Sequence, residues 1–205
     1  MWRNIIPYLL PLGRCLAPDY VGMGHSGKAP DGAYRFADPA RYLDAWFEAL
    51  DLKKNVTLIV HDRGSALGLI LERNLFIEYL LPLRGISKEA MEVYRRHYTT
   101  PGPSRQPMLT WTRELPIAGE PADMIAIVDA YARWMSSNRI PKLFINGDPA
   151  GFLIGAQREF CRTWFNQHEV TVKGAHFLHE DAREEIGRAL ARFVGEVQVG
   201  ELKAA

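Results

Sequence analysis

An aspartate and a histidine, far apart in the sequence, carry the chemistry that this chain could perform. Residues 56–62 form a short apolar run that ends in the letters HDRG, after which small residues follow. A strand that enters a helix through such a turn has the geometry of a nucleophile elbow, with the apex side chain exposed above the sheet. The apex is Asp62, and a carboxylate nucleophile forms an ester intermediate. The alternative is that Asp62 only caps the following helix.

A second site candidate, His176, follows the apolar run of residues 170–173 and a Gly-Ala pair. A neutral imidazole is suited to activating water against an ester, so Asp62 and His176 together make one two-step hydrolysis. The third candidate is Asp148, an acid that would orient the histidine, because it ends the run of residues 142–148 where parallel sheets place site residues. Its alternative role is to begin an Asp-Pro turn.

The elements that position these residues alternate in type along the chain. Without hairpin signals between the strands, this alternation predicts an α/β fold with a mostly parallel sheet flanked by helices. The predicted strands are residues 14–19, 56–62, 142–148 and 170–173, and the predicted helices are residues 39–50, 123–135 and 181–194. In the second of these helices five apolar side chains share one face: Met124, Ile127, Val128, Tyr131 and Trp134.

Residues 74–113 interrupt this alternation, because they combine short helical patterns with the turn-rich sequence TTPGPSRQP. We therefore expect a shortened helical cap there, inserted into a core made of residues 1–73 and 114–199, with a tail at 200–205. An irregular connection within the same fold is the alternative.

The composition excludes several classes of protein. The 205 residues are 47% hydrophobic, and 25 basic against 24 acidic side chains leave a net charge of +1. Such a chain buries enough apolar surface to fold, and it has no basic cluster that would favour nucleic acid or an anionic membrane. No run approaches the ~20 residues of a membrane span. Cys15 and Cys161 lack metal-site spacing, so we expect free thiols, no metal and a cytoplasmic protein that acts on small molecules.

Several motifs together resemble those of the haloalkane dehalogenases, a family of the α/β-hydrolase superfamily related to the coelenterazine luciferase of sea pansy. They are VTLIVHDRGSALG, APDYVGMGHSGK, LPIAGEPADM, IPKLFINGDPAG and the AHF..ED ending. The resemblance implies that Asp62 displaces halide from carbon and that His176 activates water to hydrolyse the ester. It implies a small halogenated organic substrate, water as the second reactant, and no cofactor.

The resemblance also assigns halide- or substrate-binding positions and shows departures from the family pattern. The positions are Arg63, Phe76, Leu115, Phe152 and Phe177. The family has a tryptophan after the nucleophile, where this chain has Arg63. The chain begins after the point where the family's halide-binding asparagine stands. Close to residue 73 the match skips a core strand and the glutamate that orients the histidine, a role we expect Asp148 to take.

These departures leave two alternatives open. One is a catalytically impaired or fragmentary relative that keeps the nucleophile and the base. The other is a haloacid dehalogenase, because HDRG is the form found in fluoroacetate dehalogenases, where that arginine binds the substrate carboxylate. Those enzymes have a second arginine where this chain has Ala66. Nothing in the sequence indicates the oligomeric state.

Overall fold

The structure is a computed structural model. It describes residues 2–35, 37–52, 54–59, 77–78, 86–100, 103–115, 120–149, 151 and 153–203. The chain divides into two compact units, the first made of Met1–Ala17 with Val128–Ala205 and the second of Pro18–Ile127.

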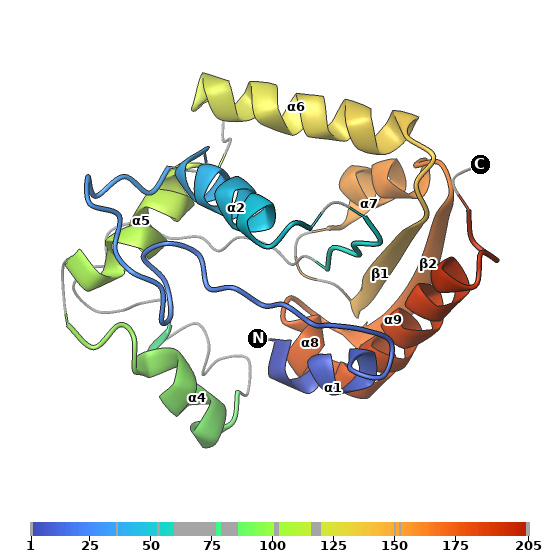
Figure 1. The fold of residues 1–205 in the computed structure, drawn as a ribbon, viewed down its shortest axis with the longest axis horizontal. Helices are drawn as coiled ribbons and strands as arrows, with labels where there is room; N and C mark the ends of the chain where they lie inside the picture. Colours follow the sequence, from blue (N-terminus) through green and yellow to red (C-terminus); the bar gives the residue numbers. More distant parts are fainter. Residues whose placement is uncertain are drawn as a thin grey trace. The chain divides into compact units, whose positions relative to one another are not determined.

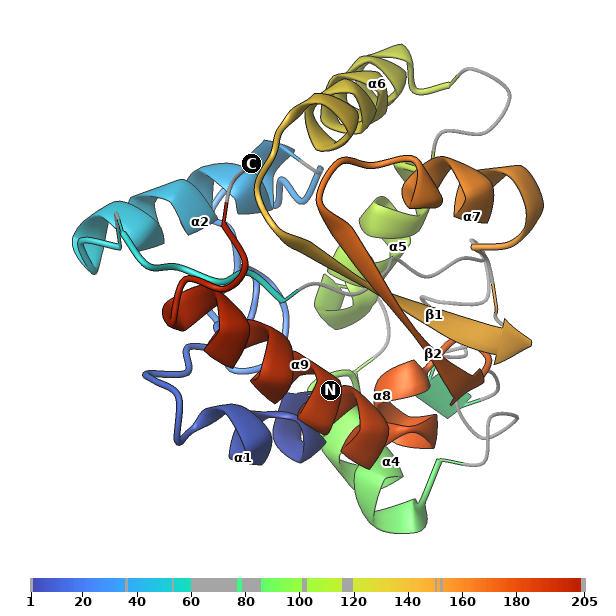
Figure 2. The same cartoon turned by 90° about the vertical axis from the view of Figure 1, so that its right-hand side faces the viewer.

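A parallel pair of strands organises the first unit (Figure 1). Strand β1 (Lys142–Pro149) and strand β2 (Gln167–Gly174) are joined through helix α7 (Gly155–Arg162), and their register runs from Lys142 opposite Gln167 to Pro149 opposite Gly174. Both strands were expected from the apolar runs, and both are confirmed with wider bounds. Helices α7 and α9 lie on opposite sides of the pair in both views (Figures 1 and 2).

The core of this unit forms where the last helix meets the first residues of the chain. Helix α9 (Arg183–Gln198) contacts α1 (Ile6–Leu9), η1 (Trp2–Asn4), α8 (Leu178–Asp181) and both strands. The side chains buried there are Ile5, Leu9, Ile186, Leu190 and Phe193. The apolar positions of α9 recur at helical spacing, so one stripe of the helix provides the contact.

The contact between α1 and α9 predicts a specific sensitivity at Gly187. A Cβ built there would overlap the ring of Tyr8, so Gly187→Val is expected to lower the free energy of unfolding by about 1–3 kcal/mol, the usual cost of overpacking. The matched control is Gly195→Val in the same helix, because a Cβ at Gly195 meets nothing within 4 Å. Urea unfolding followed by circular dichroism measures both; equal midpoints would contradict the expectation.

The first strand begins at a buried lysine. The Lys142 ammonium donates to the carbonyl oxygens of Asn138, Ile140 and Phe165 at 2.9, 3.0 and 2.9 Å. Burial lowers the pKa of Lys142, yet the three acceptors satisfy its donors. The lysine therefore ties the end of the preceding helix to the loop that leads into β2.

The longer regular elements that the structure describes in the second unit are helices, and turns and irregular segments connect them. It contains α2 (Ala37–Ala49), α4 (Lys88–Arg95), η4 (Pro103–Arg105) and α5 (Gln106–Arg113). Arg35 links the end of α5 to the start of α6 (Ala122–Ser137), since it donates to Glu114 at 3.1 Å and to Asp123 at 2.7 Å. The expected helix at 39–50 is confirmed, and the described part of residues 74–113 contains no strand, as expected.

Two of the predicted strands are wrong where they can be checked. Residues 14–19 and 56–59 form no β-ladder, because the only ladder among the described residues joins β1 to β2. A strand needs a neighbour for its backbone groups, and an apolar run does not supply one. Residues 60–62, the end of the second of these runs, lie outside the described residues.

Helix α6 (Ala122–Ser137) confirms the helix expected at 123–135, and its apolar face is only partly covered. Met124 is 2% exposed, whereas Val128, Tyr131 and Trp134 are 43–52% exposed. The helical period thus identifies which side chains share a face, but not whether another element covers them.

The second unit contains a histidine pair that makes its stability depend on pH. The rings of His25 and His97 lie 4.5 Å apart, and the pKa of His97 is lowered by burial and by the charges of His25, Arg96 and Lys28, against the opposing effect of Asp19. The unfolded chain therefore binds more protons than the folded chain near pH 6. We expect the free energy of unfolding to fall as pH drops below about 6.5.

Proton NMR of the His97 ring tests this expectation, with a titration midpoint below about 6.5 as the predicted result. The His97→Gln variant should show a shallower loss of stability between about pH 7 and pH 5 than the wild type. An unchanged slope, or a midpoint at or above the ordinary value, would contradict the assignment.

Candidate functional site

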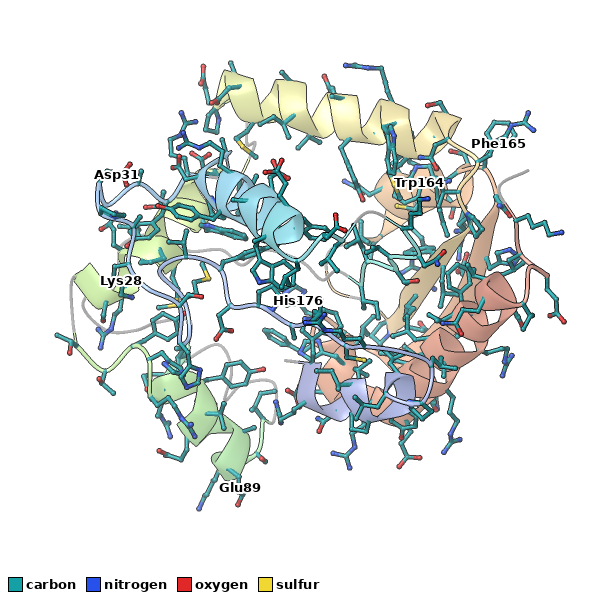
Figure 3. All side chains as sticks on the ribbon, viewed as in Figure 1. Lys28, Asp31, Glu89, Trp164, Phe165 and His176 are labelled. Atoms are coloured by element: carbon teal, nitrogen blue, oxygen red, sulfur yellow. The ribbon has the colours of Figure 1, made fainter. Side chains whose placement is uncertain are left out.

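The carboxyl ends of β1 and β2 bring together two of the residues that the sequence singled out. Asp148 is the last residue but one of β1 and lies opposite Lys173, and His176 follows β2 by two residues. Figure 3 shows His176 at the α8 end of the strand pair, with Trp164 and Phe165 at the other end. Because the strands are parallel, their carboxyl ends meet at one edge of the sheet, and that edge is where this class of sheet carries its sites.

His176 lies directly against the connection that follows β1. A Cβ built on Gly151 would stand 3.0 Å from the Cβ of His176 and 3.1 Å from its Cα. At these distances the neighbouring residue must move by a few tenths of an ångström before position 151 can hold a side chain. The backbone of Gly151 therefore packs directly against His176 and limits where that residue can lie.

The loop that carries His176 is held on its other side by α8. The Asp181 carboxylate accepts a hydrogen bond from the backbone N–H of Ala175 at 3.2 Å. Gly174 has a φ of +151°, and a Cβ there would come within 2.9 Å of Asp181 and Leu178, so the turn out of β2 requires glycine. These contacts fix the backbone immediately before His176.

The side chain of His176 is half-buried in aromatic surroundings. Its ring lies 4.7 Å from that of Phe177 in an edge-on arrangement, and Phe177 is buried. His179 is buried as well, with its Nε2 4.0 Å from Glu180, which also accepts a 2.9 Å hydrogen bond from Arg3. Imidazole and carboxylate groups are thus present beside apolar surface.

Asp148 shares the sheet edge with His176, but no hydrogen bond joins them. The Asp148 side chain is exposed, and it makes no hydrogen bond or ion pair with any residue that the structure describes. The role of Asp148 as the orienting acid therefore stays a prediction.

Of the five remaining candidate residues, the structure describes only Leu115. Leu115 is half-buried and comes two residues after α5 in the second unit. Asp62, Arg63, Phe76 and Phe152 lie outside the described residues. The roles expected of these four residues are therefore proposals.

Three residues around the carboxyl end of β1 and the loop of His176 were not predicted from the sequence as site residues: Gly151, Asp181 and Arg158. The first two contact the loop that carries His176, and Arg158 reaches the β1–α7 connection from α7. Asp181 is the final letter of the AHF..ED motif, so that motif contained a signal for it. The roles of Gly151 and Arg158 depend on contacts between elements, which spacing does not reveal.

A surface groove between α6 and α7 contains none of the candidate residues. It is lined by Asp129, Ala132, Arg133, Ser136, Ser137 and Phe160.

The described part of the chain offers no metal centre. No group of three or more His, Cys, Asp or Glu side chains within it could hold a metal ion. Cys15 and Cys161 are free thiols, and burial raises the pKa of Cys161, so its thiol form predominates at neutral pH. None of the described helices is both long and apolar enough to cross a membrane.

Comparison with known proteins identifies the family. A family model described as the alpha/beta hydrolase fold matches residues 1–71. The chain is 42% identical to a haloalkane dehalogenase of Sphingobium indicum, over 95% of this chain and 83% of that protein. It is 32% identical to the coelenterazine h 2-monooxygenase of Renilla reniformis, over 98% and 81% respectively.

Solved structures agree with this assignment. The haloalkane dehalogenase DbeA from Bradyrhizobium elkani has a TM-score of 0.86 and 31% identity, over 97% of this chain and 86% of that one. The match to the Sphingobium protein extends over 247 residues, more than the 205 of this chain, so that relative contains residues within the matched region that have no counterpart here. The expected α/β-hydrolase fold is confirmed, and this shortened chain belongs to the haloalkane dehalogenase family.

Proposed function

We propose that the protein hydrolyses the carbon–halogen bond of a small halogenated organic molecule, with water as the second reactant. The observation that carries this proposal is the place of His176. In a chain of this family, an imidazole stands half-buried at the carboxyl edge of the parallel strands, held by Gly151 on one side and by Asp181 on the other. A base in such a position activates water without any metal ion.

The proposed reaction has two steps. A carboxylate oxygen of Asp62 attacks the halogen-bearing carbon, the carbon–halogen bond breaks, and halide leaves with the bonding electrons. His176 then takes a proton from water, and the water oxygen adds to the carbonyl carbon of the ester. Cleavage of the ester releases the alcohol and restores the Asp62 carboxylate, and the proton passes from His176 to solvent.

The remaining site residues have supporting roles in this proposal. The Arg63 backbone N–H and guanidinium would bind the developing halide, and Asp148 would orient His176 after its carboxylate rotates. The apolar walls would come from Phe76, Leu115, Phe152 and Phe177, with residues 74–113 as a cap on the core. The proposal includes a cytoplasmic location and, since the reaction removes halogen from organic molecules, a role in detoxification.

A second candidate reaction, on haloacids, is favoured by one sequence observation, the arginine that follows Asp62. A guanidinium binds a carboxylate in a bidentate manner, so Arg63 would hold the acid group of a haloacetate while Asp62 attacks its halogen-bearing carbon. Both candidates use the same nucleophile and the same base, and they differ in the group that binds the substrate.

Halide release from 1,2-dibromoethane and from chloroacetate tests these proposals. We expect the wild type to release bromide, and Asp62→Asn to release none above the rate without protein, because the amide is not a nucleophile. Preferential release from chloroacetate would select the haloacid reaction. If the folded wild type releases neither halide, both reactions are contradicted and the impaired relative remains. Circular dichroism of both proteins establishes that they are folded.

A further inference from the structure

Helix α7 contains an arginine that reaches back to the connection after β1. The Arg158 Nε donates to the carbonyl oxygen of Leu153 at 3.2 Å, and its Nη2 donates to that of Gly147 at 3.4 Å. Gly147 lies in β1, and Leu153 lies just before α7. One planar guanidinium therefore holds both ends of the β1–α7 connection, which its rigid fork of donors suits.

The connection that Arg158 holds is the one that touches His176. In the sequence, Gly151 lies between Gly147 and Leu153, the two residues whose carbonyl oxygens Arg158 binds. A Cβ on Gly151 would lie within 3.4 Å of the Cβ, Cα and N atoms of His176. Asp181 fixes the other side of the same loop through the N–H of Ala175. A shift of the connection therefore changes the space that His176 occupies.

The contacts of Arg158 differ from those of the arginine one turn further along α7. Arg162 pairs with Glu159 at 2.7 Å and with Glu169 at 2.8 Å, as an exposed helix arginine does. Arg158 is half-buried, and it makes no ion pair with any residue that the structure describes. Its guanidinium is directed to backbone carbonyls instead, which is how a side chain fixes a loop.

We propose that Arg158 is a positioning residue for His176. By holding the carbonyls of Gly147 and Leu153 it fixes the wall against which His176 stands, and the water-activating step depends on that position. The inference rests on the proposed function, since it assigns Arg158 a part in the reaction of the same site.

The experiment compares Arg158→Met and Arg158→Lys with Arg162→Met as the matched control on the same helix. The first readout is the NMR signal of the His176 ring, followed through a pH titration, which does not require turnover. The second is kcat and KM for 1,2-dibromoethane. Urea unfolding of each variant separates loss of position from loss of fold.

We expect Arg158→Met to shift the His176 signal and to lower kcat about tenfold, with KM within about twofold, because small misplacements of catalytic groups cost rates of this order. Arg158→Lys keeps the charge and one donor group, so an intermediate kcat is expected. Arg162→Met should leave the His176 signal and kcat at their wild-type values.

Two results would overturn the inference. One is a His176 signal in Arg158→Met identical to that of the wild type. The other is an Arg158→Met protein that is folded and less stable but has the wild-type kcat. That result would show that Arg158 stabilises the fold without positioning His176. If the wild type releases no halide, the proposed function fails, and the NMR readout alone then decides whether Arg158 positions His176.

Discussion

Replacement of His176 by glutamine is expected to stop the reaction after one halide per protein molecule. In the proposed mechanism, the attack by Asp62 does not use the histidine, so the carbon–halogen bond still breaks. Glutamine cannot accept a proton from water, so the ester then persists. Removal of a general base lowers rates by about 10²–10⁴-fold, which makes the steady phase slow enough to separate from the first turnover.

Rapid-quench measurement of bromide from 1,2-dibromoethane, with mass spectrometry of the intact protein, checks this expectation. The variant should show a burst close to one bromide per chain and a protein mass increased by one bromoethyl group. Digestion should locate the added group on the peptide that contains Asp62. The wild type should show steady release and no accumulated adduct.

The matched control is His168→Gln. His168 is an exposed histidine at the other end of β2, with its ring 6.2 Å from that of Phe193. Its substitution should leave steady bromide release at the wild-type rate. Steady release by His176→Gln at a rate near that of the wild type would show that another group is the base. A normal burst with the adduct on a different peptide would remove Asp62 from the mechanism.

The strands illustrate how far sequence patterns determine this fold. The runs at 142–148 and 170–173 form a ladder because each has the other as its neighbour. The runs at 14–19 and, as far as it is described, 56–59 have comparable apolar character and no ladder. A strand depends on a partner from elsewhere in the chain, and the matched region of the Sphingobium relative contains residues absent from this one.

The candidate site, like the strands, could be predicted from the sequence only in part. Residue type and the position after a strand were enough to single out His176 and Asp148, and the structure places both at one sheet edge. The contact of Gly151 with His176 and the hold of Arg158 on Gly147 and Leu153 join backbone groups from different elements. No side-chain pattern in the sequence encodes such contacts, so only the folded arrangement reveals them.

The close contact of Gly151 with His176 leads to the second large expected effect, that of Gly151→Val. The nearest atoms to a new Cβ would be the Cβ and Cα of His176, at 3.0 and 3.1 Å. A backbone atom cannot swing aside as a side-chain end does, so the loop of His176 must move by several tenths of an ångström. Gly151 is not among the glycines with positive φ, so the backbone itself permits valine.

We expect Gly151→Ala to lower kcat about tenfold and Gly151→Val about 100-fold, since a misplacement near 1 Å costs about 10² in rate. Steady-state bromide release measures this, with the His176 NMR signal as a second readout. The control is Gly13→Val, because a Cβ there meets nothing within 4 Å and its φ is not positive. Wild-type kcat in a folded Gly151→Val protein would show that the wall does not position His176.

Combining Gly151→Ala with Arg158→Met sharpens this expectation. Both substitutions act on one connection, the first by moving His176 away from it and the second by releasing its ends. Effects on a shared structural element do not add, so the double variant should lose less activity than the product of the two single losses. If the two substitutions acted independently, their fold-losses in kcat would multiply. That result would mean that Gly151 positions His176 without the help of Arg158.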